Sequence, residues 1–218
     1  MDESLKNVRY VLFDLDGTVS DSSEGIMKSA DLALRSKGKE VPYDTLKSFI
    51  GPSLRISFSK YAKDEKERDE MLETYRKRYK KTGWSENVIY DGIAELVRDI
   101  KNSGRHVVLA SAKPEYFCRE ILKLFKVDKY FDFIGGSDFE GKRDDKTVLM
   151  RYVLDNIGNP APEEVVMIGD RIFDVECAHN NGIKCIGVKY GFAPENELEN
   201  AGADYIADTV EDLRKLLI

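Results

Sequence analysis

The chain has 218 residues, of which 42% are hydrophobic and 34% charged, enough for one sizeable globular core and a smaller module. Its net charge of −6 argues against a dedicated nucleic-acid-binding protein, whose domain is usually basic. No apolar run approaches the ~18 residues that span a bilayer, and the acidic N-terminus lacks a signal-peptide stretch. Cys118, Cys177 and Cys185 have no metal-ligand spacing and lie in apolar segments, which is typical of buried thiols in a reducing compartment. We therefore expect a cytoplasmic protein, and the charge and the apolar runs predict that it has no nucleic-acid or membrane partner.

The first predicted element is a buried strand that ends in two carboxylates. The apolar run of residues 8–13 is typical of a strand that is covered on both faces. Asp14 and Asp16 follow it, and Gly17 and Thr18 come next. Open α/β folds bind ligands at this edge of the sheet. The alternative is an ordinary acidic turn, because Asp and Gly are common loop residues.

The next part of the chain has a different periodicity. Residues 19–87 read as helices punctuated by turns, one of them at Gly51, and residues 64–81 have the charge density and apolar stripe of a solvated amphipathic helix. We therefore expect a helical module over residues 19–87. It interrupts a sheet domain made of residues 1–18 and 88–218.

From residue 88 onward, predicted helices alternate with predicted strands. The apolar runs that favour strands are residues 107–110, 133–134, 165–168, 184–188 and 205–206. The segments with helical spacing are residues 93–100, 114–125, 147–157, 173–181 and 213–217. This alternation indicates right-handed βαβ units, hence an α/β fold with a mainly parallel sheet.

Polar residues end three of the predicted strands. They are Asp14 with Asp16, Ser111, and Asp170, with Asp174 shortly after. A parallel sheet brings these ends to one edge, where each pair of like charges ~4 Å apart costs on the order of 4 kcal/mol at an effective dielectric near 20. A divalent cation removes that cost. Oxygen ligands without His or Cys favour magnesium over zinc.

Lys146 is a further candidate, because it lies in a turn just ahead of an apolar helical face. A lysine at the start of a helix is usually solvated, and the helix dipole disfavours a cation there. A lysine at this unfavourable position is explained if the carboxylates of the acidic site bind it. Both interpretations stay open on spacing alone.

Together these residues resemble the haloacid dehalogenase-like superfamily, in the phosphoglycolate phosphatase-like and 5′-nucleotidase-like part of its phosphatase branch. Residues 14–18 resemble the first motif, Ser111 the second, Lys146 the third, and Asp170 with Asp174 the fourth. The resemblance covers essentially the whole chain. It implies a Rossmann-like, doubly wound parallel sheet with an inserted α-helical C1 cap.

The resemblance also implies an activity: a Mg²⁺-dependent phosphatase that hydrolyses a small phosphomonoester, such as phosphoglycolate or a nucleoside monophosphate, through an aspartyl-phosphate. Asp14 would be the nucleophile and Asp16 the general acid and base. The Asp14 side chain, the Asp16 backbone carbonyl and Asp170 would hold the metal. Ser111 and Lys146 would hold the phosphoryl oxygens.

The resemblance also implies supporting roles for other residues. Asp174 would orient Lys146 or a metal-bound water, and Thr18 and the Ala112 amide would donate to phosphate. Arg55, in the insertion, either reads a second anionic group of the substrate or is a surface residue. A sugar phosphomutase and a non-catalytic binding module on the same fold are the alternatives. The expected partner is a small phosphorylated metabolite, and the expected state is a monomer or weak homodimer.

Overall fold

The structure is a computed structural model that describes residues 5–138, 142–143 and 145–218. Residues 1–4, part of the N-terminal stretch considered for a signal peptide, lie outside the described residues, as does Asp144 in the turn ahead of Lys146. The chain divides into two compact units. One comprises Met1–Ser20 and Ile89–Ile218, and the other comprises Asp21–Val88.

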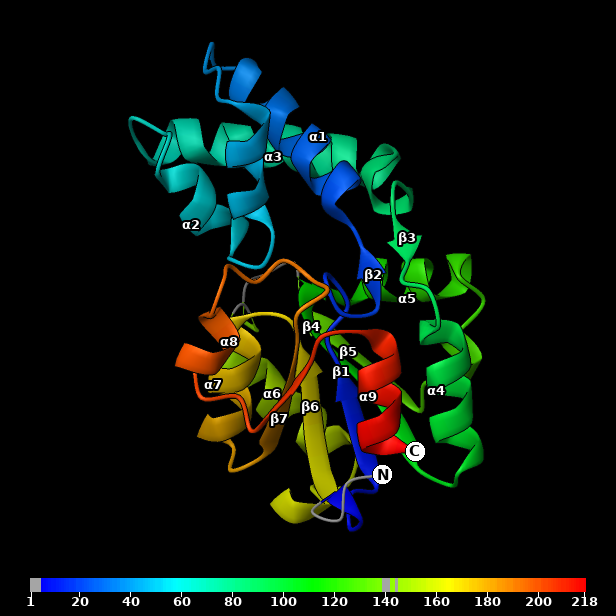
Figure 1. The fold of residues 1–218 in the computed structure, drawn as a ribbon. Coiled ribbons are helices and arrows are strands. Elements are labelled where there is room, and N and C mark those ends of the chain that lie inside the picture. The colour runs from blue at the N-terminus through cyan, green and yellow to red at the C-terminus, as the bar shows by residue number, and fades with distance from the viewer. Residues whose placement is uncertain (1–4, 139–141, 144) are drawn as a thin grey trace. The chain divides into compact units, whose positions relative to one another are not determined.

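The larger unit is built on a six-stranded parallel sheet (Figure 1). Its strands are β1 (Tyr10–Phe13), β4 (His106–Pro114), β5 (Phe133–Ser137), β6 (Val165–Gly169), β7 (Lys184–Val188) and β8 (Tyr205–Ala207). Their order is β5-β4-β1-β6-β7-β8. The order runs outward from β1 in both directions, so the carboxyl end of β1 lies at the switch point where doubly wound folds bind ligands. The predicted α/β fold class is confirmed.

Helices cover both faces of this sheet. They are α4 (Ile93–Asn102), α5 (Glu115–Leu124), α6 (Lys146–Asn156), α7 (Ile172–Asn180), α8 (Glu197–Asn200) and α9 (Val210–Leu217), with short 3₁₀ turns at Asp128–Tyr130 and Pro162–Glu164. Helices α6 and α7 pack on each other and on the sheet, whereas α4 packs with α9 (Figure 1). The strands are sandwiched between these layers, so apolar side chains are buried on both faces.

The central position of β1 follows from its composition. Val11, Leu12 and Phe13 are fully buried, and Leu12 lies in register with Val108 of β4 and Met167 of β6. A continuous apolar run has no polar face to present to water, so it fits only a strand with neighbours on both edges and helices on both faces. This register fixes where the strand ends, and therefore where Asp14 begins.

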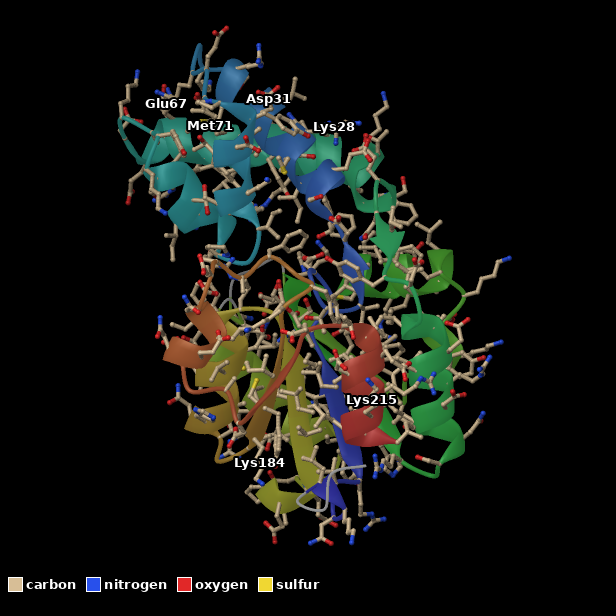
Figure 2. The ribbon with its side chains drawn as sticks, viewed as in Figure 1. Lys28, Asp31, Glu67, Met71, Lys184 and Lys215 are labelled. Carbon is tan, nitrogen blue, oxygen red and sulfur yellow. The ribbon has the colours of Figure 1, made fainter. Side chains whose placement is uncertain are left out.

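The smaller unit is helical. Its elements are α1 (Ser23–Arg35), the 3₁₀ turn Tyr43–Phe49, α2 (Leu54–Ser59), α3 (Glu65–Lys81) and the 3₁₀ turn Gly83–Ser85. The Asp64 side chain caps α3 by accepting a hydrogen bond from the Glu67 N–H at 2.8 Å. Met71 is buried on the inner side of α3, whereas Lys28 of α1 is exposed (Figure 2). The apolar stripe of α3 therefore faces the core of this unit.

An ion pair fixes the last turn of the smaller unit to its first helix. Arg78 donates two hydrogen bonds to the Glu86 carboxylate, at 2.7 and 2.9 Å, and a third to the Ser29 hydroxyl at 3.0 Å. The Gly25 N–H donates to the Glu86 carbonyl at 3.2 Å. The segment that leaves the unit is thus tied to the helix that enters it.

The chain passes between the units through two short strands. These are β2 (Ser20–Asp21) and β3 (Val88–Ile89), which form a two-stranded sheet. Within the larger unit, the Tyr90 N–H donates to the Val19 carbonyl at 3.2 Å. Across the described residues, none of the helices has the length and apolar character needed to cross a membrane.

Candidate active site

A tight turn at the end of β1 carries the two motif carboxylates. The Asp14 N–H donates to the Ile168 carbonyl of β6 at 2.9 Å, which extends the strand pairing to the first carboxylate. Gly17 adopts a φ of +83°, a conformation that residues other than glycine rarely adopt, and its N–H donates to the Ser20 carbonyl at 2.8 Å. The turn holds Asp16 beside Asp14 while Leu15 stays buried.

Gly17 also permits a close approach to the end of β6. A Cβ atom on Gly17 would lie 2.1 Å from Asp170 Oδ2 and 2.7 Å from the Phe192 ring. Asp170 directly follows β6, and its Oδ2 accepts a hydrogen bond from the Phe192 N–H at 2.7 Å. Asp170 can lie this close to the β1 turn because Gly17 has no side chain.

Lys146 begins α6 and reaches into the acidic cluster. The Asp145 side chain caps the helix by accepting hydrogen bonds from the Thr147 and Val148 N–H groups at 2.8 and 3.0 Å. The Lys146 ammonium lies 2.9 Å from Asp14 Oδ2 and 2.6 Å from Asp174 Oδ1. Burial disfavours the ammonium, but these two charges outweigh it and raise the pKa of Lys146 well above its usual value.

Two further carboxylates complete the cluster. Burial and the charges of Asp174 and Asp14 raise the pKa of Asp170 well above its usual range. Burial raises the pKa of Asp174 to about 6, although Lys146 opposes this shift. The other oxygen of Asp174 accepts the Arg171 N–H at 3.0 Å, so contacts with Lys146 and the backbone engage both of its oxygens.

The cluster fits a divalent cation. One oxygen each of Asp14, Asp170 and Asp174 lies within 4.8 Å of the others. Among the described residues, Asp14 Oδ1 and Asp170 Oδ1 are buried and accept no hydrogen bond. Buried carboxylate oxygens without a donor are costly unless a cation lies nearby. Hard oxygen ligands of this kind suit a divalent cation such as Mg²⁺.

Strand β4 brings Ser111 to the same edge and then departs from regular pairing. Ser111 pairs with Gly136 of β5, but the next pair is Pro114 with Ser137, so Ala112 and Lys113 form a bulge. Sequence reasoning missed Lys113, whose side chain is only 5% exposed and whose ammonium lies 2.8 Å from Asp16 Oδ2. The signal in the sequence is a lysine two residues after Ser111, beyond the strand end that we expected.

The remaining candidates differ in position. Thr18 is fully buried in the β1 turn, and its carbonyl accepts a hydrogen bond from the Tyr190 hydroxyl at 3.0 Å. Arg55 lies on α2 in the smaller unit, where its 51% exposed side chain pairs with Asp69 at 3.0 Å. The structure therefore gathers the candidates of the larger unit at one edge of the sheet, whereas Arg55 belongs to the smaller unit.

Known proteins resemble this chain over nearly its whole length. The family model for haloacid dehalogenase-like hydrolases matches residues 11–188. A 5′-nucleotidase of Pseudomonas aeruginosa is 41% identical, with 96% of each chain covered. The tyrosine-protein kinase PtkA of Mycobacterium tuberculosis is 33% identical over 96% of this chain and 72% of its own. The crystal structure of a predicted phosphatase from Clostridium acetobutylicum superposes with a TM-score of 0.91 at 42% identity, covering 95% of this chain and 97% of that one.

The fold and the carboxylate cluster at its switch point thus define a phosphoryl-handling α/β enzyme. The chain belongs to the haloacid dehalogenase-like hydrolases. Within that family it is a phosphatase, a hydrolase of phosphoric monoesters.

Proposed function

We propose that the protein is a Mg²⁺-dependent phosphatase that hydrolyses a small phosphorylated metabolite through a phosphorylated Asp14. One observation carries this proposal. Asp14 Oδ2 is held by Lys146 at 2.9 Å, whereas its buried Oδ1 accepts no hydrogen bond from the described residues. The contact with Lys146 fixes the orientation of the Asp14 carboxylate, as a nucleophile in an enzyme site requires.

Asp16 is the proposed general acid and base. It protonates the leaving oxygen while a bond forms between Asp14 and phosphorus and the ester P–O bond breaks. It then takes a proton from the water that hydrolyses the aspartyl-phosphate. The β1 turn supports this division of work, because it holds both carboxylates at the end of one strand.

The metal site consists of Asp14, the Asp16 backbone carbonyl and Asp170. When bound, Mg²⁺ would neutralise charge and so ease the approach of two anions. Among the described residues, the carboxylates of Asp14, Asp16, Asp170 and Asp174 outnumber the ammonium groups of Lys113 and Lys146 that pair with them. A divalent cation balances that excess. Asp174 supports the site by orienting Lys146.

The phosphoryl-binding groups are Ser111, the Ala112 amide, Thr18 and Lys146. Charge spreads over the phosphoryl oxygens during transfer, so fixed donors stabilise the transition state more than the ground state. The bulge of β4 supports this assignment for Ala112, because Ala112 lies outside the regular pairing of β4 with β5 and its N–H group is not needed for that pairing. The buried Thr18 hydroxyl has no hydrogen-bond partner among the described residues.

The smaller unit is the proposed cap, which closes over the site, excludes water and selects the substrate. Arg55 is its proposed selectivity residue for substrates with a second anionic group. The physiological substrate belongs to the class of small phosphomonoesters, for which phosphoglycolate and nucleoside monophosphates are the first candidates. The buried free cysteines suit a cytoplasmic location, and a monomer or weak homodimer without membrane or nucleic-acid partners completes the proposal.

The test is phosphate release from a panel of phosphomonoesters by the wild type, Asp14→Asn and the matched control Asp155→Asn, whose carboxylate is exposed on α6. We expect turnover by the wild type and control, no turnover by Asp14→Asn, and loss of activity in chelator that added Mg²⁺ restores. Residual turnover by Asp14→Asn near the wild-type rate contradicts the nucleophile assignment. Activity that needs a bisphosphate activator, or phosphate delivered to tyrosine rather than water, favours the transfer reactions instead.

A further inference from the structure

Lys113 is a buried cation that the proposed chemistry leaves without a role. Its side chain is 5% exposed, and its ammonium lies 2.8 Å from Oδ2 of Asp16, which is itself 16% exposed. A buried lysine loses hydration that ion pairs only partly replace, so a site keeps such a residue at a cost in stability. This cost indicates a role beyond packing.

The backbone aims Lys113 at Asp16 through the bulge of β4. Between Ser111 and Pro114, β4 uses two more residues than its partner strand β5. A Cβ atom on Gly136 of β5 would lie 2.7 Å from the Lys113 carbonyl and 2.5 Å from the Glu115 backbone nitrogen. The bulge therefore fits only against a glycine. The two extra residues, Ala112 and Lys113, therefore lie outside the regular pairing of β4 with β5.

The two lysines of the site serve different carboxylates. Lys146 contacts Asp14 and Asp174, whereas the ion pair of Lys113 is with Asp16. Asp16 Oδ2 is engaged by Lys113, and the buried Asp16 Oδ1 accepts no hydrogen bond from the described residues. The ion pair with Lys113 thus occupies Oδ2 of Asp16 and leaves Oδ1 able to hydrogen-bond to a substrate.

We propose that Lys113 is a positioning residue that holds Asp16 so that its Oδ1 delivers the proton to the leaving oxygen. This inference rests on the proposed phosphatase function. The proton moves from Asp16 Oδ1 to the ester oxygen as the ester P–O bond breaks and the bond from Asp14 to phosphorus forms. Lys113 donates a hydrogen bond to Oδ2 throughout and transfers no proton. Its contribution is the orientation of the acid.

This role makes a selective prediction about leaving groups. An alkoxide is a poor leaving group and needs protonation, whereas 2,4-dinitrophenolate departs readily without it. Lys113→Met keeps most of the apolar stem and removes the ammonium. We expect it to lower kcat/KM for an alkyl phosphomonoester by at least about tenfold more than for 2,4-dinitrophenyl phosphate, since positioned acids contribute ~10²–10⁴-fold.

The experiment measures, on one sample of each variant, the ratio of kcat/KM for an alkyl phosphomonoester to kcat/KM for 2,4-dinitrophenyl phosphate. The alkyl ester is whichever of phosphoglycolate and the nucleoside monophosphates the wild type hydrolyses fastest. The ratio does not depend on the fraction of folded enzyme, so it remains meaningful if the variant is unstable. Lys113→Gln provides a second sample of the same kind. Asp16→Asn gives the ratio expected when the acid is absent, and Lys123→Met, at an exposed lysine of α5, gives the wild-type ratio.

A ratio for the Lys113 variants that shifts toward that of Asp16→Asn supports the proposal. A wild-type ratio, with both esters slowed equally, overturns it, because a structural or phosphoryl-binding role acts on both esters alike. Failure of the phosphatase function itself looks different. In that case the wild type hydrolyses neither ester, or Asp14→Asn retains turnover.

Discussion

Replacement of Gly17 by alanine should disable the site through a single methyl group. The added Cβ would lie 2.1 Å from Asp170 Oδ2, whereas ordinary van der Waals contact begins near 3.4 Å, so the two atoms must separate by about 1.3 Å. The added Cβ would also lie 2.7 Å from the Phe192 ring, so moving it away from Asp170 does not relieve the overlap with Phe192. The strain therefore falls on the carboxylate of Asp170 or on the turn that carries Asp16.

The expected magnitudes have two parts. An alanine at a φ of +83° costs ~1–2 kcal/mol, and the loss of glycine flexibility in the unfolded chain offsets ~0.4–1 kcal/mol of this. Overlap with Asp170 adds about 1–3 kcal/mol of destabilisation, as for other overpacked interiors. Displacement of a catalytic group by about 1 Å lowers turnover on the order of 10²-fold.

Gly104→Ala is the matched control. Gly104 lies in the same unit with a φ of +87°, but no atom lies within 4 Å of the Cβ it would gain. Urea unfolding and kcat/KM at saturating Mg²⁺ are measured for both variants. We expect both to lose the backbone contribution, and Gly17→Ala alone to lose the additional stability and the activity. Equal activity in the two variants would refute the argument that the close approach to Asp170 matters.

Three more predictions concern side chains. If Lys146 binds the transferring phosphoryl group as proposed, Lys146→Ala should lower kcat for every phosphomonoester by a similar factor, on the order of 10² or more. Arg55→Ala should instead raise KM for substrates with a second anionic group and leave the hydrolysis of p-nitrophenyl phosphate unchanged. Steady-state kinetics of both variants on several esters would show whether the two roles are reversed. Glu86→Gln should lower the free energy of unfolding by about 1–3 kcal/mol at neutral pH, because it weakens charged hydrogen bonds to Arg78. The hydrogen bonds from Arg78 lower the pKa of Glu86, so this stabilisation is present above the usual pKa of a glutamate and is lost as the pH falls through the lowered value. The unfolding free energies of the wild type and Glu86→Gln, measured by urea titration, should therefore converge in acid. A difference between the two free energies that grows in acid would contradict the prediction.

The sequence predicts the sheet well because its signals are local. A run such as Val11–Phe13 requires burial on both faces, and the alternation of such runs with helices leaves a parallel α/β sheet as the consistent arrangement. The carboxyl ends of neighbouring parallel strands must then meet. For this reason Asp14 and Asp170, 156 positions apart in the chain, lie together in the structure, as their strand-end positions suggest.

The position of Lys113 illustrates what the sequence does not reveal. Lys113 lies in a bulge of β4, and the bulge depends on the absence of a side chain at Gly136 in another strand. No local pattern around Ser111 contains that information. The hydrogen bond from the Phe192 N–H to Asp170 is similar, because it joins a loop after β7 to the end of β6 through a backbone group. Contacts of this kind depend on tertiary approach rather than on residue type.

The hydrogen bond between Tyr90 and Val19 has a consequence for how such an enzyme diversifies. Val19 and Tyr90 lie just outside the two ends of the inserted unit, so their hydrogen bond holds both ends of the insertion together within the larger unit. Segments of very different length can be spliced between these two points without a change in strand register. A protein engineer can therefore graft a foreign insert at this junction and expect the strand register of the larger unit to be kept.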